Sequence, residues 1–271
     1  MKNNALVMIH GLLGSLDFFS PDKYIPQANI YTPTLIGYGS FDNQDNTKNL
    51  KLQDQVDFVK RLIAEKIKKP CWIFGHSVGG AIAMMFAAQN PELTKGIINV
   101  EGNFTLNDAF WSQKISKLSL DVWQQEYEEL RNTPKKWLLD SGINPIQERM
   151  IWAEQILNYQ PASTVKAVAK AVVLETSHQA YSQVIQLVIK QKTQIYLLAG
   201  EKSKDGWDVP EQVQDEAVRF IVQPHVGHMM MLEEPQAFCE IIRGVIEKKR
   251  LTKRVRRTAG IRRHLQAFST L

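Results

Sequence analysis

Gly75-His76-Ser77-Val78-Gly79 lies between an apolar run at residues 71–74 and a segment of small residues at 80–88. An apolar run followed by a turn and a helix predicts that Ser77 stands in a sharp bend at the end of a buried strand. A glycine two residues to either side removes the Cβ atoms that would collide in such a bend. The following helix would direct its free N–H groups and positive dipole end toward developing negative charge. The stretch therefore predicts a nucleophilic serine.

Working outward from this stretch, short apolar runs predict six strands, and apolar residues at helical spacing predict the helices around them. The strands are expected at residues 5–9, 30–35, 71–74, 97–100, 195–200 and 219–222. Helical spacing of apolar residues predicts helices at 52–69, 78–89 and from Pro235 onward. Strands that alternate with helices favour an α/β fold with a mostly parallel sheet covered on both faces. Residues 104–190 are rich in helix signals and interrupt this alternation.

The size and composition fit one domain followed by a basic tail. The chain has 271 residues, of which 44% are hydrophobic, enough for one large core. We expect a domain at residues 1–247, with a helical insert at about 104–190, and a tail at 248–271. The tail has nine Lys and Arg and no acid, so subtracting it from the net charge of +5 leaves −4 for the rest. The tail could contact nucleic acid or an anionic surface, although a solvated extension is the interpretation we favour.

Cysteine usage and hydropathy indicate the compartment. Cys71 and Cys239 lie far apart in apolar stretches, which favours buried thiols over a disulfide. The sequence contains no signal peptide pattern and no apolar run of the ~18 residues that a membrane helix needs. We therefore expect a cytoplasmic protein without a membrane span.

Four landmarks in the right order resemble the α/β-hydrolase superfamily over residues 5 to about 246. They are His10-Gly11 after the first strand, the loop Leu35-Ile36-Gly37-Tyr38-Gly39-Ser40, the Ser77 turn, and Val226-Gly227-His228-Met229 followed by Glu233-Glu234-Pro235. The resemblance implies an α/β-hydrolase fold with a helical lid, and a serine hydrolase of carboxylesterase type. Because the resemblance starts directly at the strand before the His-Gly turn, we expect this chain to lack the first two strands of the fuller fold.

A serine hydroxyl needs a base within hydrogen-bond reach, and His228 is the candidate. His225 is three residues away, so a metal-binding pair must be weighed; no ligand cluster at metal spacing accompanies it, and we expect neither metal nor cofactor. His10 and His76 belong to turns that flank the pocket. His178 and His264 lack a motif.

The carboxylate that would orient His228 is left open between two positions. The usual family site, three residues after Gly200, is Ser203 and not an acid. Asp205 would serve if that loop is lengthened, and Asp208 is a weaker candidate. Glu101 follows the fourth strand, where relatives resembling haloalkane dehalogenases carry their acid. Position alone favours Glu101 over Asp205.

Acyl transfer also requires donors for the tetrahedral oxyanion. The backbone N–H of Val78 is one, and the resemblance implies the N–H of Leu12, within the His10-Gly11-Leu12 turn, as the other. The insert, with its tryptophans and with Phe18, Phe19, Phe104 and Phe110, suggests a partly apolar pocket, although Trp123 and Trp137 equally suit the insert's own core.

Three functions remain open from these residues. The first is hydrolysis of a small or medium carboxylic ester, with thioesters as a variant. The second is carbon–carbon hydrolysis or a menaquinone-pathway-like lyase reaction, because the run from His10 to Ser15 resembles such enzymes. These usually require pocket arginines, and the insert has only Arg131 and Arg149. The third is a non-catalytic ligand-binding homologue, which would have no need of a serine, a histidine and an oxyanion turn together.

Overall fold

The computed structural model describes residues 4–39, 47 and 49–248, so the predicted basic tail lies outside the described residues apart from Lys248. Six strands form one sheet in the order β2-β1-β3-β4-β5-β6, and every neighbouring pair is parallel. The strands are β1 (Asn4–Ile9), β2 (Ala28–Tyr31), β3 (Cys71–His76), β4 (Thr94–Val100), β5 (Ile195–Gly200) and β6 (Arg219–Gln223). The predicted α/β-hydrolase sheet of about six strands is therefore confirmed.

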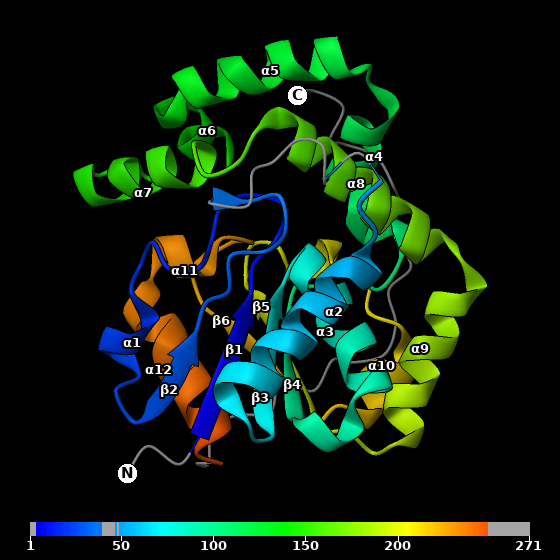
Figure 1. The fold of residues 1–271 in the computed structure, drawn as a ribbon. Helices are drawn as coiled ribbons and strands as arrows, with labels where there is room; N and C mark the ends of the chain where they lie inside the picture. Colours follow the sequence, from blue (N-terminus) through cyan, green and yellow to red (C-terminus); the bar gives the residue numbers. More distant parts are fainter. Residues whose placement is uncertain (1–3, 40–46, 48, 249–271) are drawn as a thin grey trace.

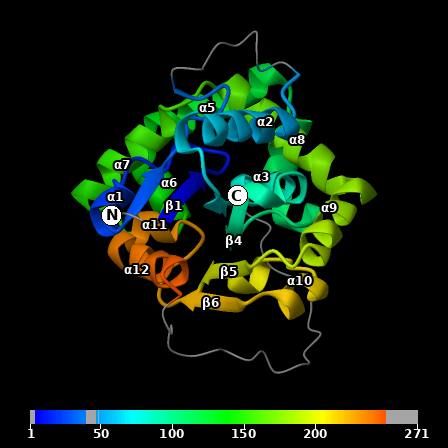
Figure 2. The same cartoon turned by 60° about the horizontal axis from the view of Figure 1, so that its bottom comes forward.

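Alternate residues of each strand separate into two hydrophobic cores, one on each face of the sheet. Val7, Ile73 and Leu197 pack in one core, whereas their neighbours along the strands pack in the other. The first core is covered by α2 (Leu52–Leu62), α3 (Val78–Gln89), α9 (Gln179–Lys190) and α10 (Glu211–Glu216). The second is covered by α1 (Pro21–Tyr24), α11 (Met230–Glu233) and α12 (Pro235–Ile246). Figure 2 shows the sheet between α12 and α3.

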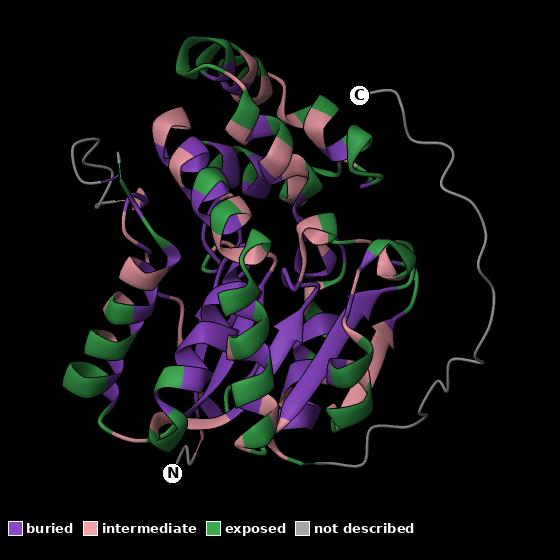
Figure 3. Cartoon of the chain, turned by 90° about the vertical axis from the view of Figure 1, so that its right-hand side faces the viewer, coloured by how far each residue is buried: buried purple, intermediate pink, exposed green. Residues whose placement is uncertain are grey.

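The interior of the sheet is closed to water on both sides. The four central strands are buried along most of their length and the edge strands β2 and β6 are mostly half-buried, while the outer faces of the helices are exposed (Figure 3). Nearly continuous apolar strands of this kind are typical of parallel sheets covered by helices.

Several predicted strands differ from the structure by one to three residues at an end, and two further elements differ for a clear physical reason. The second strand ends at Tyr31, not at residue 35, because Pro33 has no N–H to donate to a neighbouring strand. The helix predicted at 52–69 is α-helical to Leu62 and continues as a π-helical turn, Ile63–Ile67, which ends at Lys68 with φ of 56°.

The segment between β4 and β5 is almost entirely helical, and its helices lie in two places. After a short 3-10 turn (Leu106–Ala109) come α4 (Phe110–Lys117), α5 (Leu120–Asn132), α6 (Pro134–Asp140), α7 (Gln147–Leu157), α8 (Ala162–Ser177) and α9. Helices α5, α6 and α7 lie beyond the carboxyl ends of the strands (Figure 1), whereas α9 packs on α3 against the sheet. Among the described helices, none has the length and apolar character needed to cross a bilayer.

Candidate active site

Ser77 occupies the tight bend between β3 and α3. Its backbone has φ of 53° and ψ of −123°, a left-handed conformation that a non-glycine residue adopts only at a cost. Three backbone hydrogen bonds hold it there: Ser77 N–H donates to Val100 O (3.1 Å), and Ser77 O accepts from Gly80 (2.8 Å) and Asn103 (3.2 Å). The end of β4 and the start of α3 therefore fix the serine at the carboxyl edge of the sheet.

The two motif glycines let the bend close. A Cβ atom on Gly75 would lie 2.1 Å from Gly79 O, and one on Gly79 would lie 2.4 Å from Ile9 O. Both contacts are with backbone atoms, which cannot move aside as a flexible side chain would. The start of α3 thus passes directly over the ends of β1 and β3, and Val78 N–H belongs to a first helical turn that has no intrahelical acceptor.

His228 lies on the loop that follows β6 and is paired with Glu101. Its Nδ1 is 2.7 Å from Glu101 Oε2. The His228 side chain is 44% exposed, whereas the Glu101 side chain is 5% exposed. Because an ionised carboxylate can only accept, Nδ1 carries the proton, and Nε2 of a neutral ring is left as the acceptor.

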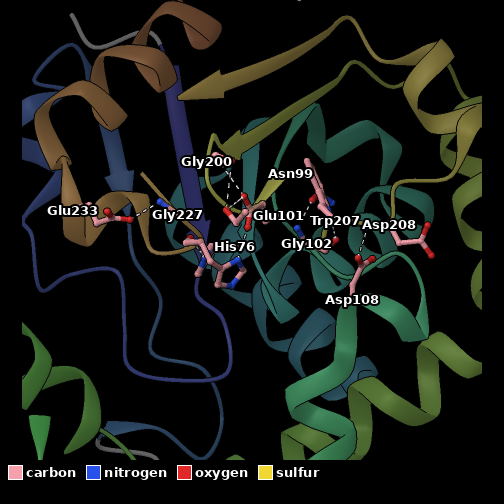
Figure 4. Close-up of polar contacts among 12 residues, drawn as sticks. His76, Asn99, Glu101, Gly102, Asp108, Gly200, Trp207, Asp208, Gly227 and Glu233 are labelled. Atoms are coloured by element: carbon pink, nitrogen blue, oxygen red, sulfur yellow. Dashed lines mark hydrogen bonds and ion pairs between the residues drawn. The ribbon is translucent and has the colours of Figure 1, made fainter. Parts of the chain in front are cut away.

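Glu101 directly follows β4. Its carboxylate is bound by groups at the end of the neighbouring strand β5 and in the loop that follows β5. Oε1 accepts from Gly200 N–H (2.8 Å) and from the Ser203 hydroxyl (2.6 Å). Figure 4 shows Gly200 beside Glu101 at the carboxyl edge of the sheet. Burial alone would raise the pKa of the Glu101 carboxyl, but the hydrogen bond and charge of His228, with the bonds from Ser203 and Gly200, together lower that pKa below its ordinary value. The group facing His228 is therefore a carboxylate.

His76 supports the backbone of His228. The His76 ring is buried, its Nε2 is 3.1 Å from His228 O, and the two ring centroids are 4.6 Å apart. Burial, followed by the charge of His228, lowers the pKa of His76 well below its ordinary value. A neutral His76 that donates from Nε2 to the His228 carbonyl therefore sets where the His228 loop passes.

Ser77 and His228 thus lie at the same end of the sheet. Within the described part of the chain, no hydrogen bond joins the Ser77 hydroxyl to His228. Catalytic hydrogen bonds of this kind often shorten only when substrate is bound.

The turn after β1 lies against the serine. A Cβ atom on Gly11 would be 3.0 Å from Ser77 Cβ. His10 Nδ1 donates to Gly11 O (2.9 Å), and Tyr38 OH donates to Leu12 O (3.0 Å). Burial lowers the pKa of His10 to about 4, so this ring is neutral near pH 7. These contacts fix the peptide unit that contains Leu12 N–H and the unit that follows it, next to the nucleophile.

The other sequence candidates lie away from the His228 imidazole. Asp205 is 79% exposed and forms an ion pair with Lys204 at 2.7 Å. Asp208 accepts from Thr105 Oγ1 (2.7 Å) and Asn107 Nδ2 (2.8 Å), which ties the loop after β5 to the loop after β4. His225 N–H donates to Glu201 Oε2 (2.8 Å). Among the described residues, no group of three His, Cys, Asp or Glu side chains is arranged to hold a metal ion.

Two supporting residues of the site were not singled out from the sequence. Ser203 occupies the position where an acid was sought, and its hydroxyl binds the acid of the neighbouring strand instead. Glu233 is buried on α11, where Oε1 accepts from Gly227 N–H (2.5 Å) and Oε2 pairs with Lys202 (3.0 Å) (Figure 4). It braces the residue before His228. The available signal for Glu233 was an acidic residue in the apolar segment just after the Gly-His pair.

The fold and this edge of the sheet define a class of α/β proteins with a serine, a histidine and a carboxylate at the ends of parallel strands. The chain belongs to the alpha/beta hydrolase family, whose model matches residues 6–241.

Three comparisons show how far this membership reaches. A protein of Haemophilus influenzae named as a 2-succinyl-6-hydroxy-2,4-cyclohexadiene-1-carboxylate synthase is 23% identical over 251 residues, covering 90% of this chain and 97% of that protein. A crystal structure from a study of carboxylesterases of Nitrososphaera gargenis has a TM-score of 0.70 at 17% identity and covers 92% of each chain. MenH from S. aureus has a TM-score of 0.69 at 15% identity, covering 92% of this chain and 95% of that one. At these identities the likeness to the solved structures shows the fold alone.

Proposed function

We propose that this protein is a serine hydrolase that cleaves a small or medium carboxylic ester through an acyl-enzyme on Ser77. The observation that carries the proposal is the 2.7 Å contact between His228 Nδ1 and the buried Glu101 carboxylate, beside a serine in the strained bend. That contact orients the ring so that Nε2 is free to act as the base.

The chemistry would proceed in two halves. Ser77 Oγ attacks the ester carbonyl carbon while His228 Nε2 takes the hydroxyl proton, and the N–H groups of Val78 and Leu12 bind the oxyanion. The intermediate collapses, and the leaving alcohol takes the proton from His228. Water then attacks the acyl carbon, gives its proton to His228, and the released Ser77 oxygen recovers it. Glu101 stays ionised and stabilises the imidazolium in both halves.

The helices α5, α6 and α7 are proposed as the lid that shapes the substrate pocket. They lie beyond the carboxyl ends of the strands, where specificity is set in this fold. Trp123 is buried and donates from Nε1 to Ala162 O (2.8 Å), so it stabilises the insert itself. Leu13 and Met229, which are partly buried and directly follow Leu12 and His228 in the chain, are proposed to contribute to an apolar lining.

The second candidate is a lyase reaction like that named for the Haemophilus influenzae relative. Its named product bears a ring carboxylate, for which a cationic partner in the pocket is expected. Both arginines of the insert are engaged with the protein. Arg131 donates to Asn158 Oδ1 (2.9 Å), and Arg149 donates to Glu233 O (2.5 Å). These contacts favour the ester over the anionic substrate.

The test combines labelling with substrate turnover. A fluorophosphonate probe should modify Ser77, located by peptide mass spectrometry, and Ser77→Ala should abolish both labelling and hydrolysis of p-nitrophenyl esters from acetate to octanoate. The acyl chain length that is hydrolysed fastest then indicates how long an acyl group the pocket accommodates. Hydrolysis that survives in Ser77→Ala, or turnover of the lyase substrate alone, would contradict the proposal.

A further inference from the structure

A side chain from the helical insert holds the turn that follows β1. Gly14 N–H donates to Gln160 Oε1 at 2.7 Å, and both residues are buried although they are 146 positions apart in sequence. Gln160 lies between α7 and α8, where the insert passes over the end of β1. This bond joins the insert to the same turn that carries Leu12, one of the two proposed oxyanion donors.

The Gln160 amide can be oriented in only one way. Gly14 N–H is a donor, so the atom that faces it must be the amide oxygen. The amide nitrogen then donates to Ile156 O (3.0 Å) and to the Tyr127 hydroxyl, which in turn donates to Leu157 O (2.9 Å). Every polar atom of this buried group is used, and replacing it by an apolar side chain leaves a buried N–H without a partner.

The turn is held by two hydrogen bonds just after Leu12. Tyr38 OH donates to Leu12 O, and two residues further along Gln160 accepts from Gly14 N–H. The turn also rests on α7, because a Cβ atom on Gly14 would lie 2.9 Å from Ile156 Cγ2. These contacts fix the chain as it leaves Leu12 and so restrict the direction of its N–H.

The insert has further attachments to the body that do not involve Gln160. Gly39 N–H donates to Tyr159 O (2.8 Å), and Thr164 Oγ1 donates to Gly37 O (2.8 Å). Loss of the Gln160 side chain should therefore release the turn without detaching the insert. We infer that Gln160 is a positioning residue that aims Leu12 N–H at the oxyanion, an inference that rests on the proposed esterase function.

The experiment compares Gln160→Met with Gln191→Met in the full-length protein. Gln191 is a matched control because its Nε2 also donates to a main-chain oxygen, Ala88 O (3.0 Å). This contact lies at the C-terminal end of α3, the end opposite Ser77. Loss of an oxyanion donor typically costs about a hundredfold or more in rate, so misdirecting Leu12 N–H should lower kcat by about tenfold to a hundredfold. KM should change by less than about twofold, and binding of phenylboronic acid, which forms a tetrahedral adduct with serine, should weaken by a factor similar to that in kcat. Gln191→Met should leave kcat and boronate binding near the wild-type values.

The outcomes separate this inference from the proposed function. A wild-type protein that neither reacts with a fluorophosphonate nor hydrolyses esters would overturn both. An active wild type whose Gln160→Met variant keeps kcat and boronate affinity at the level of Gln191→Met would overturn the positioning role alone.

If circular dichroism shows that Gln160→Met is unfolded, Tyr127→Phe serves in its place. It removes only the hydroxyl that accepts from Gln160 Nε2. This variant should lower kcat by about threefold at unchanged KM, because it frees one end of the amide. Unchanged kcat in a folded Tyr127→Phe would also overturn the inference.

Discussion

Substitutions of Glu101 and of Asp205 test which of the two carboxylates orients the His228 ring. We predict that Glu101→Gln lowers kcat by about a thousandfold to ten-thousandfold, because an amide at this position favours the wrong tautomer of the ring. Asp205→Asn should change kcat by less than about twofold, since Asp205 is exposed and paired with Lys204. Steady-state kinetics on the preferred ester measure both. Equal losses from the two substitutions would be incompatible with Glu101 as the orienting acid.

The neighbours of Glu101 explain why a carboxylate is tolerated in so buried a place. It faces one imidazole, one hydroxyl and one backbone N–H, so that both oxygens are hydrogen-bonded. A buried carboxylate with fewer partners would take up a proton and lose its ability to stabilise an imidazolium. Ser203 is thus part of what keeps Glu101 ionised.

At the junction of β3 and α3, the motif glycines bring the two elements together. We predict that Gly75→Ala destabilises the protein by at least about 3 kcal/mol, because the new Cβ meets the Gly79 carbonyl at 2.1 Å and neither backbone can withdraw. Gly206→Ala is the matched control, with no atom within 4 Å of the added Cβ. It should change the free energy of unfolding by no more than about 0.5 kcal/mol.

Urea denaturation followed by tryptophan fluorescence measures both glycine variants. A Gly75→Ala protein as stable as Gly206→Ala would mean that α3 can move away from β3. That movement would carry Val78 N–H with it, so the same variant should also lose activity.

At the carboxyl edge of the sheet, local sequence motifs predict the tight bends but not the contacts between distant segments. The bend at Ser77 and the loop of His228 were found because each is marked by glycines within a few residues. Gln160 carries no such mark, because its partner Gly14 is 146 residues away and only the packed insert brings them together. Likewise, Glu101 and Ser203 meet because β4 and β5 pair in the register Val100↔Leu198, which no local pattern contains.

The larger architecture was predicted more completely than its details. The strand at 195–200 and the helix at 78–89 have the predicted bounds, because apolar runs bounded by turn residues define them locally. The strand near residue 30 was predicted to reach residue 35, but Tyr31 is followed by Thr32-Pro33-Thr34 and the strand hydrogen bonding stops before Pro33. Position alone favoured Glu101 over Asp205, but both follow adjacent strands, and only the folded chain places the Glu101 carboxylate 2.7 Å from His228 Nδ1.

The stability of the protein should depend on pH through its buried histidines. The pKa of His10 is lowered from 6.5 to about 4, so the unfolded chain binds a proton in this interval that the folded chain does not. Stability is therefore fully present above pH 6.5 and is lost as the pH falls toward 4, by up to about 3 kcal/mol for this residue. His76, whose pKa is also lowered, acts in the same direction.

The urea midpoints of the wild type and of His10→Gln, measured between pH 7.5 and 4.5, check this pH dependence of stability. The wild-type midpoint should fall with acidification, and the slope should be smaller in His10→Gln. Identical slopes would show that His10 does not remain neutral and buried in the folded state.

The fastening of residues 156–164 to the loops after β1 and β2 has a consequence for protein engineering. Chimeras that exchange the helices between β4 and β5 among family members would replace Gln160 and Tyr159 while retaining Gly14 and Thr34, which bond the Gln160 amide oxygen and the Tyr159 hydroxyl. Such grafts would then carry mismatched hydrogen-bonding partners at two places and lose turnover for reasons unrelated to substrate fit. Recombination boundaries set inside α7 and α8, so that this crossing segment travels with its native loops, would let specificity be varied separately from rate.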